Sequence, residues 1–227
     1  RLGFSESIMS RYKTLLDNTE GMIIITGPTG SGKTSTLYAT INELLNKFPG
    51  KKIMTAEDPI EFRYEGDDVS QSQLLRARGL GFAELLRSFL RHDPDIMLVG
   101  EIRDQETAET AIKCVQTGHL LLTTLHTPNA TATIERLKFL GVNAAEFMSV
   151  TKGIIGQRLV SQICPECAVK HKPGKEKVLN FFGSIPTKKI SFYHGKGCSA
   201  CRMTGYIRRT PLVELWTPDD EERIRMH

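Results

Sequence analysis

Short apolar runs recur along the chain and are separated by longer amphipathic segments. Four runs, at residues 22–26, 52–56, 96–99 and 119–125, are rich in isoleucine, leucine and methionine and have the length of strands. They lack the regular polar alternation of a strand with one solvated face, so we expect strands that are covered on both faces. The pattern therefore predicts a parallel sheet between layers of helices.

The segments between these runs have the 3.6-residue periodicity of helices. Ser5 is a candidate N-cap, because Ile8 and Tyr12 follow it at helical spacing. The pair Asp93-Pro94 is expected to stop another helix, since proline cannot continue one. The later helices are expected at residues 33–47, 82–92, 104–117, 130–140 and 143–150. Strands that alternate with helices in this order indicate an α/β fold.

The pattern changes near the end of the chain. Residues 164–205 have little apolar periodicity and are rich in lysine, glycine and cysteine, which indicates a small separate module. We expect a core over residues 1–160 and the module over residues 161–216. Residues 217–227 contain Thr-Pro-Asp-Asp, which is typical of a helix start, so we expect a helical segment to begin there.

Composition narrows the class of protein. The 227 residues suffice for one α/β domain and a small addition, and 40% hydrophobic with 25% charged residues is the balance of a globular protein. No apolar run approaches the roughly 20 residues of a membrane span. The net charge of +4 permits an acidic partner without requiring one, and basic residues are scattered apart from residues 170–177 and 202–209. Because Arg1 is not a methionine, the chain is interpreted as a fragment.

A phosphate-binding loop follows the first predicted strand. Residues 27–34 read Gly-Pro-Thr-Gly-Ser-Gly-Lys-Thr, which fits G-x-x-x-x-G-K-[ST]. Glycines let backbone N–H groups converge on phosphate oxygens, and the following helix points its positive end at the same anion. Lys33 is expected to reach the β- and γ-phosphates, and Thr34 to offer its hydroxyl to Mg²⁺. The residues expected to hold ATP are Gly27, Pro28, Thr29, Gly30, Ser31, Gly32, Lys33, Thr34 and Ser35.

Two carboxylates stand at or just beyond predicted strand ends. Glu57 follows the second strand and Glu101 follows the third. Because ligands of open parallel sheets bind outside the carboxyl ends of the strands, both are expected to face the phosphate loop. Such a hydrolase needs one carboxylate in the Mg²⁺ shell and one that orients the attacking water. We assign Glu101 to Mg²⁺, which it would bind directly or through water. Glu57, Glu101 and Lys33 are the catalytic candidates. The alternative is that an acid at a strand end is only a turn residue.

Two histidines flank the fourth predicted strand. His119 begins it and His126 ends it. A histidine at a strand end is commonly a satisfied structural residue, and this remains the main alternative for His119. His126 lies at the carboxyl end between two threonines, where a polar side chain can sense the γ-phosphate, so it joins the catalytic candidates.

Four of the five cysteines form two C-x-x-C pairs, Cys164 with Cys167 and Cys198 with Cys201. Two such pairs supply four thiolates to one tetrahedral Zn²⁺, and four thiolates close its coordination shell, which makes a structural role the expected one. Two disulfides are one alternative, but they are rare in the reducing compartment where ATP is used. A redox C-x-x-C site is another, but such a site needs one pair and not two. Cys114 lies in a predicted helix and is expected in the core.

Five motifs together resemble one family, the secretion ATPases of type II secretion and type IV pili. Residues 27–39 (GPTGSGKTSTLYA) resemble its Walker A motif and residues 55–62 (TAEDPIEF) its aspartate box. Residues 91–104 (RHDPDIMLVGEIRD) resemble its Walker B motif and residues 117–127 (TGHLLLTTLHT) its histidine box. Residues 156–167 (GQRLVSQICPEC) are similar to the approach to its tetracysteine motif. The resemblance runs from about residue 2 to residue 216.

The resemblance implies a RecA-like P-loop NTPase core and a homo-hexamer with ATP at its subunit interfaces. It implies a motor that assembles a pilus or pseudopilus. Such a motor works at the cytoplasmic face of the inner membrane and is held there through a platform protein and a cytoplasmic adaptor. Glu57 then corresponds to the catalytic glutamate and Glu101 to the Walker B acid. Ser35 and Gly81 depart from the threonines that many members carry there.

Two other functions stay open. The first is a retraction or DNA-transfer motor. The four cysteines argue against retraction, because retraction ATPases generally lack them. The second is a zinc-bearing nucleic-acid-binding module whose phosphate loop is vestigial. An inactive site would not be expected to keep all of its functional residues, and here these are intact: Lys33, Thr34, Glu57 and Glu101. We therefore expect no specific nucleic acid.

The family's N-terminal domain, which helps to close the nucleotide site and supplies arginines, is absent from this sequence. We therefore expect the chain to bind nucleotide and to hydrolyse it slowly. The arginines of the chain that remain as candidates for the nucleotide are Arg76, Arg78, Arg87 and Arg91.

Overall fold

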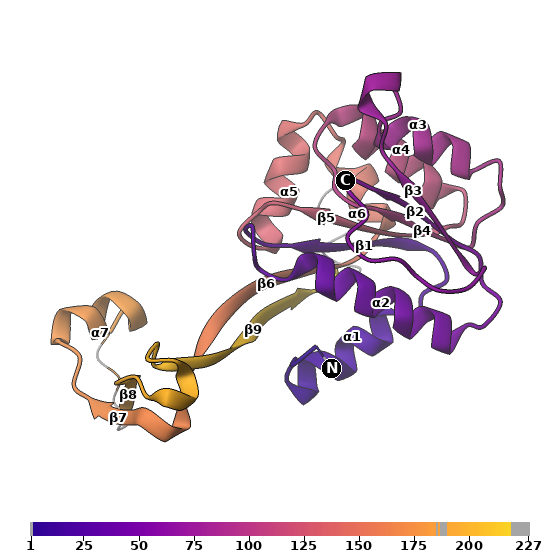
Figure 1. Cartoon of the computed structure of the whole chain (residues 1–227). Helices are drawn as coiled ribbons and strands as arrows, with labels where there is room; N and C mark the ends of the chain where they lie inside the picture. The colour runs from indigo at the N-terminus through magenta and orange to yellow at the C-terminus, as the bar shows by residue number, and fades with distance from the viewer. Residues whose placement is uncertain (1, 185, 187–189, 219–227) are drawn as a thin grey trace. The chain divides into compact units, whose positions relative to one another are not determined.

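The structure is a computed structural model of the chain and describes residues 2–184, 186 and 190–218. The described chain divides into two compact units. The first, which we call the core unit, holds residues 2–158 and 211–218, and the second, the cysteine module, is Leu159–Thr210 (Figure 1). The final residues of the segment expected to begin a helix, 219–227, lie outside the described residues.

A seven-stranded sheet has the order β3-β2-β4-β5-β1-β6-β9. The pairs β2–β3, β2–β4, β4–β5, β5–β1 and β1–β6 are all parallel. The strands are β1 (Gly21–Thr26), β2 (Ile53–Glu57), β3 (Val69–Gln73), β4 (Ile96–Val99), β5 (Leu120–Leu125), β6 (Thr151–Ile163) and β9 (Tyr206–Trp216). This confirms the predicted α/β fold with a parallel sheet.

Helices cover both faces of the sheet (Figure 1). They are α1 (Glu6–Leu15), α2 (Lys33–Lys47), α3 (Phe82–Phe89), α4 (Gln105–Gln116), α5 (Ala130–Phe139) and α6 (Ala144–Val150). In β1, Ile23 and Ile25 pack in a cluster with α1 and α2, whereas Met22 and Ile24 pack in a cluster with α3 to α6. This alternation explains why residues 22–25 of the strand are all apolar.

The predicted helix boundaries agree with the structure to within a few residues. Ser5 caps α1 by accepting a hydrogen bond from the backbone of Ile8, and Asp104 caps α4 in the same way. Helix α3 ends at Phe89, three residues earlier than predicted, and Asp93 has a positive φ just before the proline. Cys114 is buried in α4, as expected.

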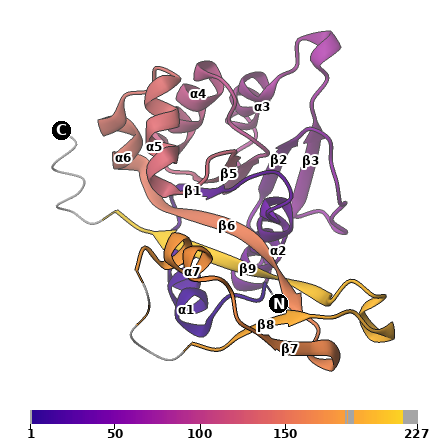
Figure 2. The ribbon, with the colours of Figure 1, turned by 90° about the vertical axis from the view of Figure 1, so that its left-hand side faces the viewer.

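Three strands of the sheet carry no strong sequence signal. Strand β3 reads Val-Ser-Gln-Ser-Gln and lies at the edge of the sheet, so little of it is buried. Strands β6 and β9 are neighbours in the sheet and run side by side (Figure 2). Both extend from the core unit into residues of the cysteine module, where their side chains become exposed and the apolar pattern is lost.

The described residues of the cysteine module include a hairpin, a helix and two short turns of 3₁₀-helix. Strand β7 (Ala168–His171) pairs antiparallel with β8 (Phe192–Gly195), and α7 spans Lys175–Phe182. The 3₁₀ turns are Pro165–Cys167 and Ser199–Cys201, and a further one in the core unit is Arg76–Arg78. The sequence did not predict α7, because eight residues without a buried position have no core-facing stripe. No helix in the described part of the chain has the length and apolarity needed to cross a bilayer.

Candidate nucleotide and metal sites

A cavity of about 470 Å³ opens at the carboxyl edge of the sheet. Because β2, β4, β5 and β1 are parallel neighbours, the residues that follow them meet at this edge. Residues 29–35 of the phosphate loop line the cavity together with Glu57, Glu101 and His126. The structure therefore brings together the loop, both carboxylates and the histidine that the sequence singled out.

The phosphate loop needs glycine where its backbone leaves the usual regions. Gly27, Gly30 and Gly32 have φ values of 154°, 75° and 89°. A Cβ at Gly27 would lie 2.2 Å from the carbonyl oxygen of Gln157. Gly32 is the N-cap of α2 and supplies no side chain, so the first N–H groups of this helix face the cavity without a side-chain cap. The loop thus has the backbone geometry of an anion cradle.

Gln157 of β6 supports the loop from behind. Its Nε2 donates to the carbonyl oxygen of Ser31 at 2.8 Å, and its Oε1 accepts from the hydroxyl of Thr36 at 2.8 Å. The amide is almost fully buried, so both of its hydrogen bonds hold the loop and the first turn of α2 together. No sequence pattern identified Gln157, because the contact joins residues 126 positions apart.

Lys33 folds back on its own loop. Its Nζ donates to the carbonyl oxygens of Gly27 at 2.9 Å and Pro28 at 3.2 Å, and lies 3.3 Å from Nδ1 of His126. Burial lowers the pKa of Lys33, and the negative charge of Glu101 partly opposes this. The ammonium group is therefore held at the mouth of the anion cradle, with acceptors that phosphate oxygens can replace.

Glu101 links two basic groups of the cavity. Its Oε2 accepts from Nε of Arg103 at 2.7 Å, and its Oε1 lies 3.5 Å from Nε2 of His126. Arg103 also lies 3.9 Å from a carboxylate oxygen of Asp58. The ring of His126 thus stands between Lys33 and Glu101, and it borders the same cavity as the phosphate loop.

Glu57 has three hydrogen-bond donors and is 6% exposed. Oε1 accepts from the hydroxyl of Thr55 at 2.6 Å and from Nε2 of Gln71 at 3.0 Å. Oε2 accepts from the hydroxyl of Tyr38, which lies on α2. Burial, followed by the bond to Glu57, raises the pKa of Tyr38 to about 12, so this hydroxyl stays protonated and donates. The carboxylate is consequently held in one orientation toward the cavity.

Oxygen ligands suited to Mg²⁺ lie beside the loop. The hydroxyl of Thr34 is 3.5 Å from Oε1 of Glu61, and Glu101 borders the same cavity. Hydroxyl and carboxylate oxygens are the ligands that Mg²⁺ prefers, and it keeps several waters when it binds phosphates. The residues present therefore fit this ion.

The remaining sequence candidates lie elsewhere. His119 contacts the carbonyl oxygen of Cys114 at 2.9 Å and borders a different cavity, at the amino end of β5. Arg87 pairs with Glu84 and Glu106. Among the described arginines only Arg103 lines the nucleotide cavity. The sequence had not singled it out, although its position two residues after Glu101 could have suggested it.

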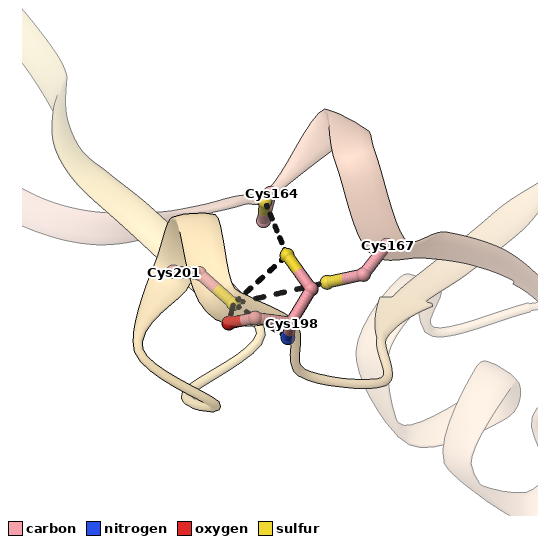
Figure 3. Close-up of side chains that lie close together, drawn as sticks. All are labelled: Cys164, Cys167, Cys198 and Cys201. Atoms are coloured by element: carbon pink, nitrogen blue, oxygen red, sulfur yellow. Dashed lines mark hydrogen bonds between the residues drawn. The ribbon is translucent and has the colours of Figure 1, made fainter.

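The four cysteines of the two C-x-x-C pairs come together in the cysteine module (Figure 3). Their Sγ atoms all lie within 4.8 Å of one another, with closest separations of 3.7, 3.8 and 3.9 Å. A tetrahedron with Zn–S bonds of about 2.3 Å has S···S edges of about 3.8 Å. The spacing therefore fits one zinc ion and is too long for disulfides, and all five cysteines of the chain are free thiols.

Backbone groups support negative charge on the sulfur of Cys201, whereas burial raises the pKa of the Cys164 and Cys167 thiols. The N–H groups of Cys198 and Gly205 each lie 3.2 Å from Sγ of Cys201. Burial alone would raise the pKa of the Cys201 thiol, but these hydrogen bonds and the neighbouring thiols lower it to about 6. A thiolate is the form that binds zinc, so the cluster is suited to the ion.

Comparison with protein families matches residues 1–227 of the chain to the family described as "Type II/IV secretion system protein". A "Type IV pilus assembly ATPase PilB" of Thermus thermophilus is 40% identical over 98% of this chain and 25% of its own length. A "Type II secretion system protein E" of Pseudomonas aeruginosa is 40% identical over 100% of this chain and 44% of its own length. The chain thus spans less than half of either relative.

Solved structures show the same fold. The pilus retraction motor PilT with bound ADP has a TM-score of 0.69 at 29% identity, covering 99% of this chain and 54% of the motor. The Legionella pneumophila ATPase DotB has a TM-score of 0.68 at 27% identity, covering 99% of this chain and 51% of its own. Both similarities extend across almost the entire sequence.

Proposed function

The chain belongs to the type II/IV secretion system protein family, and from this premise we propose that it is the ATP-hydrolysing part of a motor that assembles a type IV pilus or a type II secretion pseudopilus. One observation carries the proposal: the glycine-rich loop, Glu57 and Glu101 meet at one cavity at the carboxyl edge of the sheet. A loop that only bound an anion would not need two carboxylates beside it.

The phosphate loop, Lys33, Glu57 and His126 each have a task in this proposal. Backbone N–H groups of the loop and of α2 hold the phosphates, and Lys33 exchanges the carbonyl oxygens of Gly27 and Pro28 for phosphate oxygens. Glu57, fixed by its three donors, orients the attacking water. His126 lies between Lys33 and Glu101 and responds to the γ-phosphate.

Thr34 and Glu101 would hold Mg²⁺, which supplies positive charge to the phosphate oxygens when it is bound. Cys164, Cys167, Cys198 and Cys201 would hold a structural zinc ion. Four thiolates leave no open coordination position, so we assign zinc to the stability of the cysteine module and not to the reaction.

Assembly is favoured over retraction by sequence identity. The relatives named as assembly or secretion proteins are 40% identical, whereas the retraction motor with the same fold is 29% identical. The four clustered cysteines support the same choice. As part of the same proposal, the protein forms a hexamer with ATP at its subunit interfaces. Its partners are a platform protein and an adaptor at the inner membrane.

Two measurements test this function. Phosphate release from Mg-ATP by the chain should be lost in Lys33→Ala and retained in Lys47→Ala, which changes a lysine at the opposite end of the same helix. In cells, the full-length protein with Glu57→Gln should leave no assembled pili or secreted substrate. Pili that still assemble but no longer shorten would instead assign the protein to retraction.

A further inference from the structure

Strand β3 lies at the edge of the sheet and has a polar sequence, Val-Ser-Gln-Ser-Gln. Polar side chains on an edge strand are commonly solvated and keep other strands from pairing with it. Gln71, the central residue of β3, differs from this pattern. It is only partly exposed, and both the nitrogen and the oxygen of its amide have hydrogen-bond partners within the chain. Its side chain therefore holds other parts of the chain together.

The amide of Gln71 joins three groups. Its Nε2 donates to Oε1 of Glu57 at 3.0 Å and to the carbonyl oxygen of Phe62 at 2.9 Å. Its Oε1 accepts from the backbone N–H of Tyr64 at 2.9 Å. A glutamine amide has two N–H donors and one carbonyl oxygen, so these bonds use both donors and the acceptor. Turning the amide over would set its oxygen against two other oxygens, so only one orientation satisfies all three bonds.

The register of the sheet explains why Gln71 reaches Glu57. Strands β2 and β3 are parallel neighbours, and Gln71 is the partner of Thr55. Because residues two apart on a strand point to the same face, Gln71, Thr55 and Glu57 share one face of the sheet. Two donors therefore meet the same carboxylate oxygen, Thr55 from its own strand at 2.6 Å and Gln71 from the edge strand at 3.0 Å.

The same amide also holds the segment that connects β2 to β3. Its bonds to Phe62 and Tyr64 fix the backbone of this segment. Glu61, next to Phe62, borders the nucleotide cavity, and its Oε1 lies 3.5 Å from the hydroxyl of Thr34 in the phosphate loop. A displacement of the segment would therefore act on the acid beside the phosphate loop and, through Gln71, on Glu57.

We propose that Gln71 is a positioning residue for ATP hydrolysis, which ties the orientation of the Glu57 carboxylate to the backbone at Phe62 and Tyr64. The inference rests on the proposed function, because it needs Glu57 to orient the attacking water. Gln71 lies outside the lining of the cavity and acts only through Glu57. A carboxylate that turned away would leave the water without its acceptor, so the chemical step would slow while nucleotide binding stayed the same.

The first test is Gln71→Leu, which removes both donors and the acceptor of the amide. Steady-state phosphate release should show kcat about tenfold lower or more, with KM for ATP within about twofold of the parent. The stoichiometry of binding of a fluorescent ATP analogue gives the folded fraction, so that kcat refers to folded chains. The matched control is Gln116→Leu, which changes an exposed glutamine at the end of α4 and should behave as the parent does.

The second test is Gln71→Glu, which keeps the shape of the side chain and makes its effect depend on pH. An ionised carboxylate at this position repels Glu57 and the carbonyl oxygen of Phe62, so kcat at about pH 8 should fall about a hundredfold. These neighbours raise the pKa of the added carboxyl, and its protonated form donates a hydrogen bond as the amide did. Relative to the parent, kcat should therefore recover about tenfold or more as the pH is lowered to about 6.

The groups around the added carboxyl leave this pH dependence to it. Burial raises the pKa of Tyr38 and of Tyr64, so both hydroxyls stay protonated over this range. Glu57 keeps its hydroxyl donors Thr55 and Tyr38, so the proton goes to the added carboxyl.

The outcomes separate this inference from the proposed function. A parent-like kcat in Gln71→Leu, together with an inactive Glu57→Gln, would overturn the positioning role and leave the proposed function in place. So would a pH profile of Gln71→Glu that runs parallel to that of the parent. Parent-like hydrolysis by Glu57→Gln would instead overturn the proposed function, and the positioning role with it.

Discussion

The hydroxyl of Tyr38 donates a hydrogen bond to Oε2 of Glu57 and so connects the helix that follows the phosphate loop with the carboxylate at the end of β2. Tyr38 lies five residues after Lys33 on α2. Its ring stacks on that of Tyr64, with centroids 5.2 Å apart, and its hydroxyl accepts from the backbone of Phe62 at 3.2 Å. The tyrosine is thus fixed from three sides, and a movement of the loop helix would be transmitted to Glu57.

Tyr38→Phe is expected to lower kcat by about one order of magnitude or more while KM for ATP stays within about twofold. A hydrogen bond to a charged group contributes about 1.5–3 kcal/mol, and Tyr38 acts on Glu57 without touching the phosphates. Steady-state phosphate release gives both constants. Tyr12→Phe is the control, because it removes a hydroxyl that bonds to Thr40 on the same helix, outside the cavity. A rise in KM without a change in kcat would assign Tyr38 to nucleotide binding.

Lys33→Ala is expected to weaken ATP binding strongly and to abolish hydrolysis, because no other described lysine lines the cavity. Binding of a fluorescent ATP analogue, followed by titration, measures the first effect. Lys47→Ala should bind as the parent does. Parent-like hydrolysis by Lys33→Ala would place the active site elsewhere.

Glu57→Gln and Glu101→Gln are each expected to reduce kcat by at least a hundredfold and to change ATP affinity much less. A water-orienting or metal-holding carboxylate acts mainly in the transition state. Single-turnover hydrolysis together with equilibrium binding separates the two quantities. Glu65→Gln, which changes an exposed acid that does not line the cavity, should behave as the parent does. A loss of affinity in step with turnover would reassign the residue to binding.

The chain is expected to contain one zinc ion, and Cys198→Ser is expected to lose it, because the remaining three thiolates cannot close the tetrahedron. Elemental analysis of the purified chain counts the ion. Cys114→Ala should keep it, since this thiol is buried in α4. Full retention in Cys198→Ser would point to other ligands, of which His171 and His194, with rings 5.3 Å apart, are the nearest alternatives.

The chain by itself is expected to bind ATP and to hydrolyse it slowly. Arg103 is the one described arginine that lines the cavity, and it is already engaged by Glu101 and Asp58. An arginine delivered to the γ-phosphate is worth roughly a thousandfold or more in turnover. The measurement is phosphate release per chain, compared with a longer protein that includes sequence upstream of residue 1, with mass from light scattering. If the chain is monomeric and hydrolyses ATP as fast as the longer protein, two expectations are contradicted. One is that hydrolysis needs an arginine from outside this chain, and the other is that it needs a ring of subunits.

The sequence by itself determined the local features of this protein. Strand β1, the glycine-rich loop and α2 are adjacent along the chain, and apolar runs, glycines and helix signals are local properties. For this reason the helix over residues 33–47 and the four buried strands were predicted to within one residue. The two C-x-x-C pairs were recognised for the same reason, because each half of the cluster is complete within four residues.

Only the tertiary structure decided how the carboxylates are held and which residues join them. The pairing of β2 with β4 puts Glu57 and Glu101 at one edge, and the pairing of β4 with β5 and of β5 with β1 puts the phosphate loop at the same edge. This pairing depends on packing between distant segments. Tyr38, Gln71 and Gln157 reach the site across 14 to 126 residues, so no local pattern could reveal them.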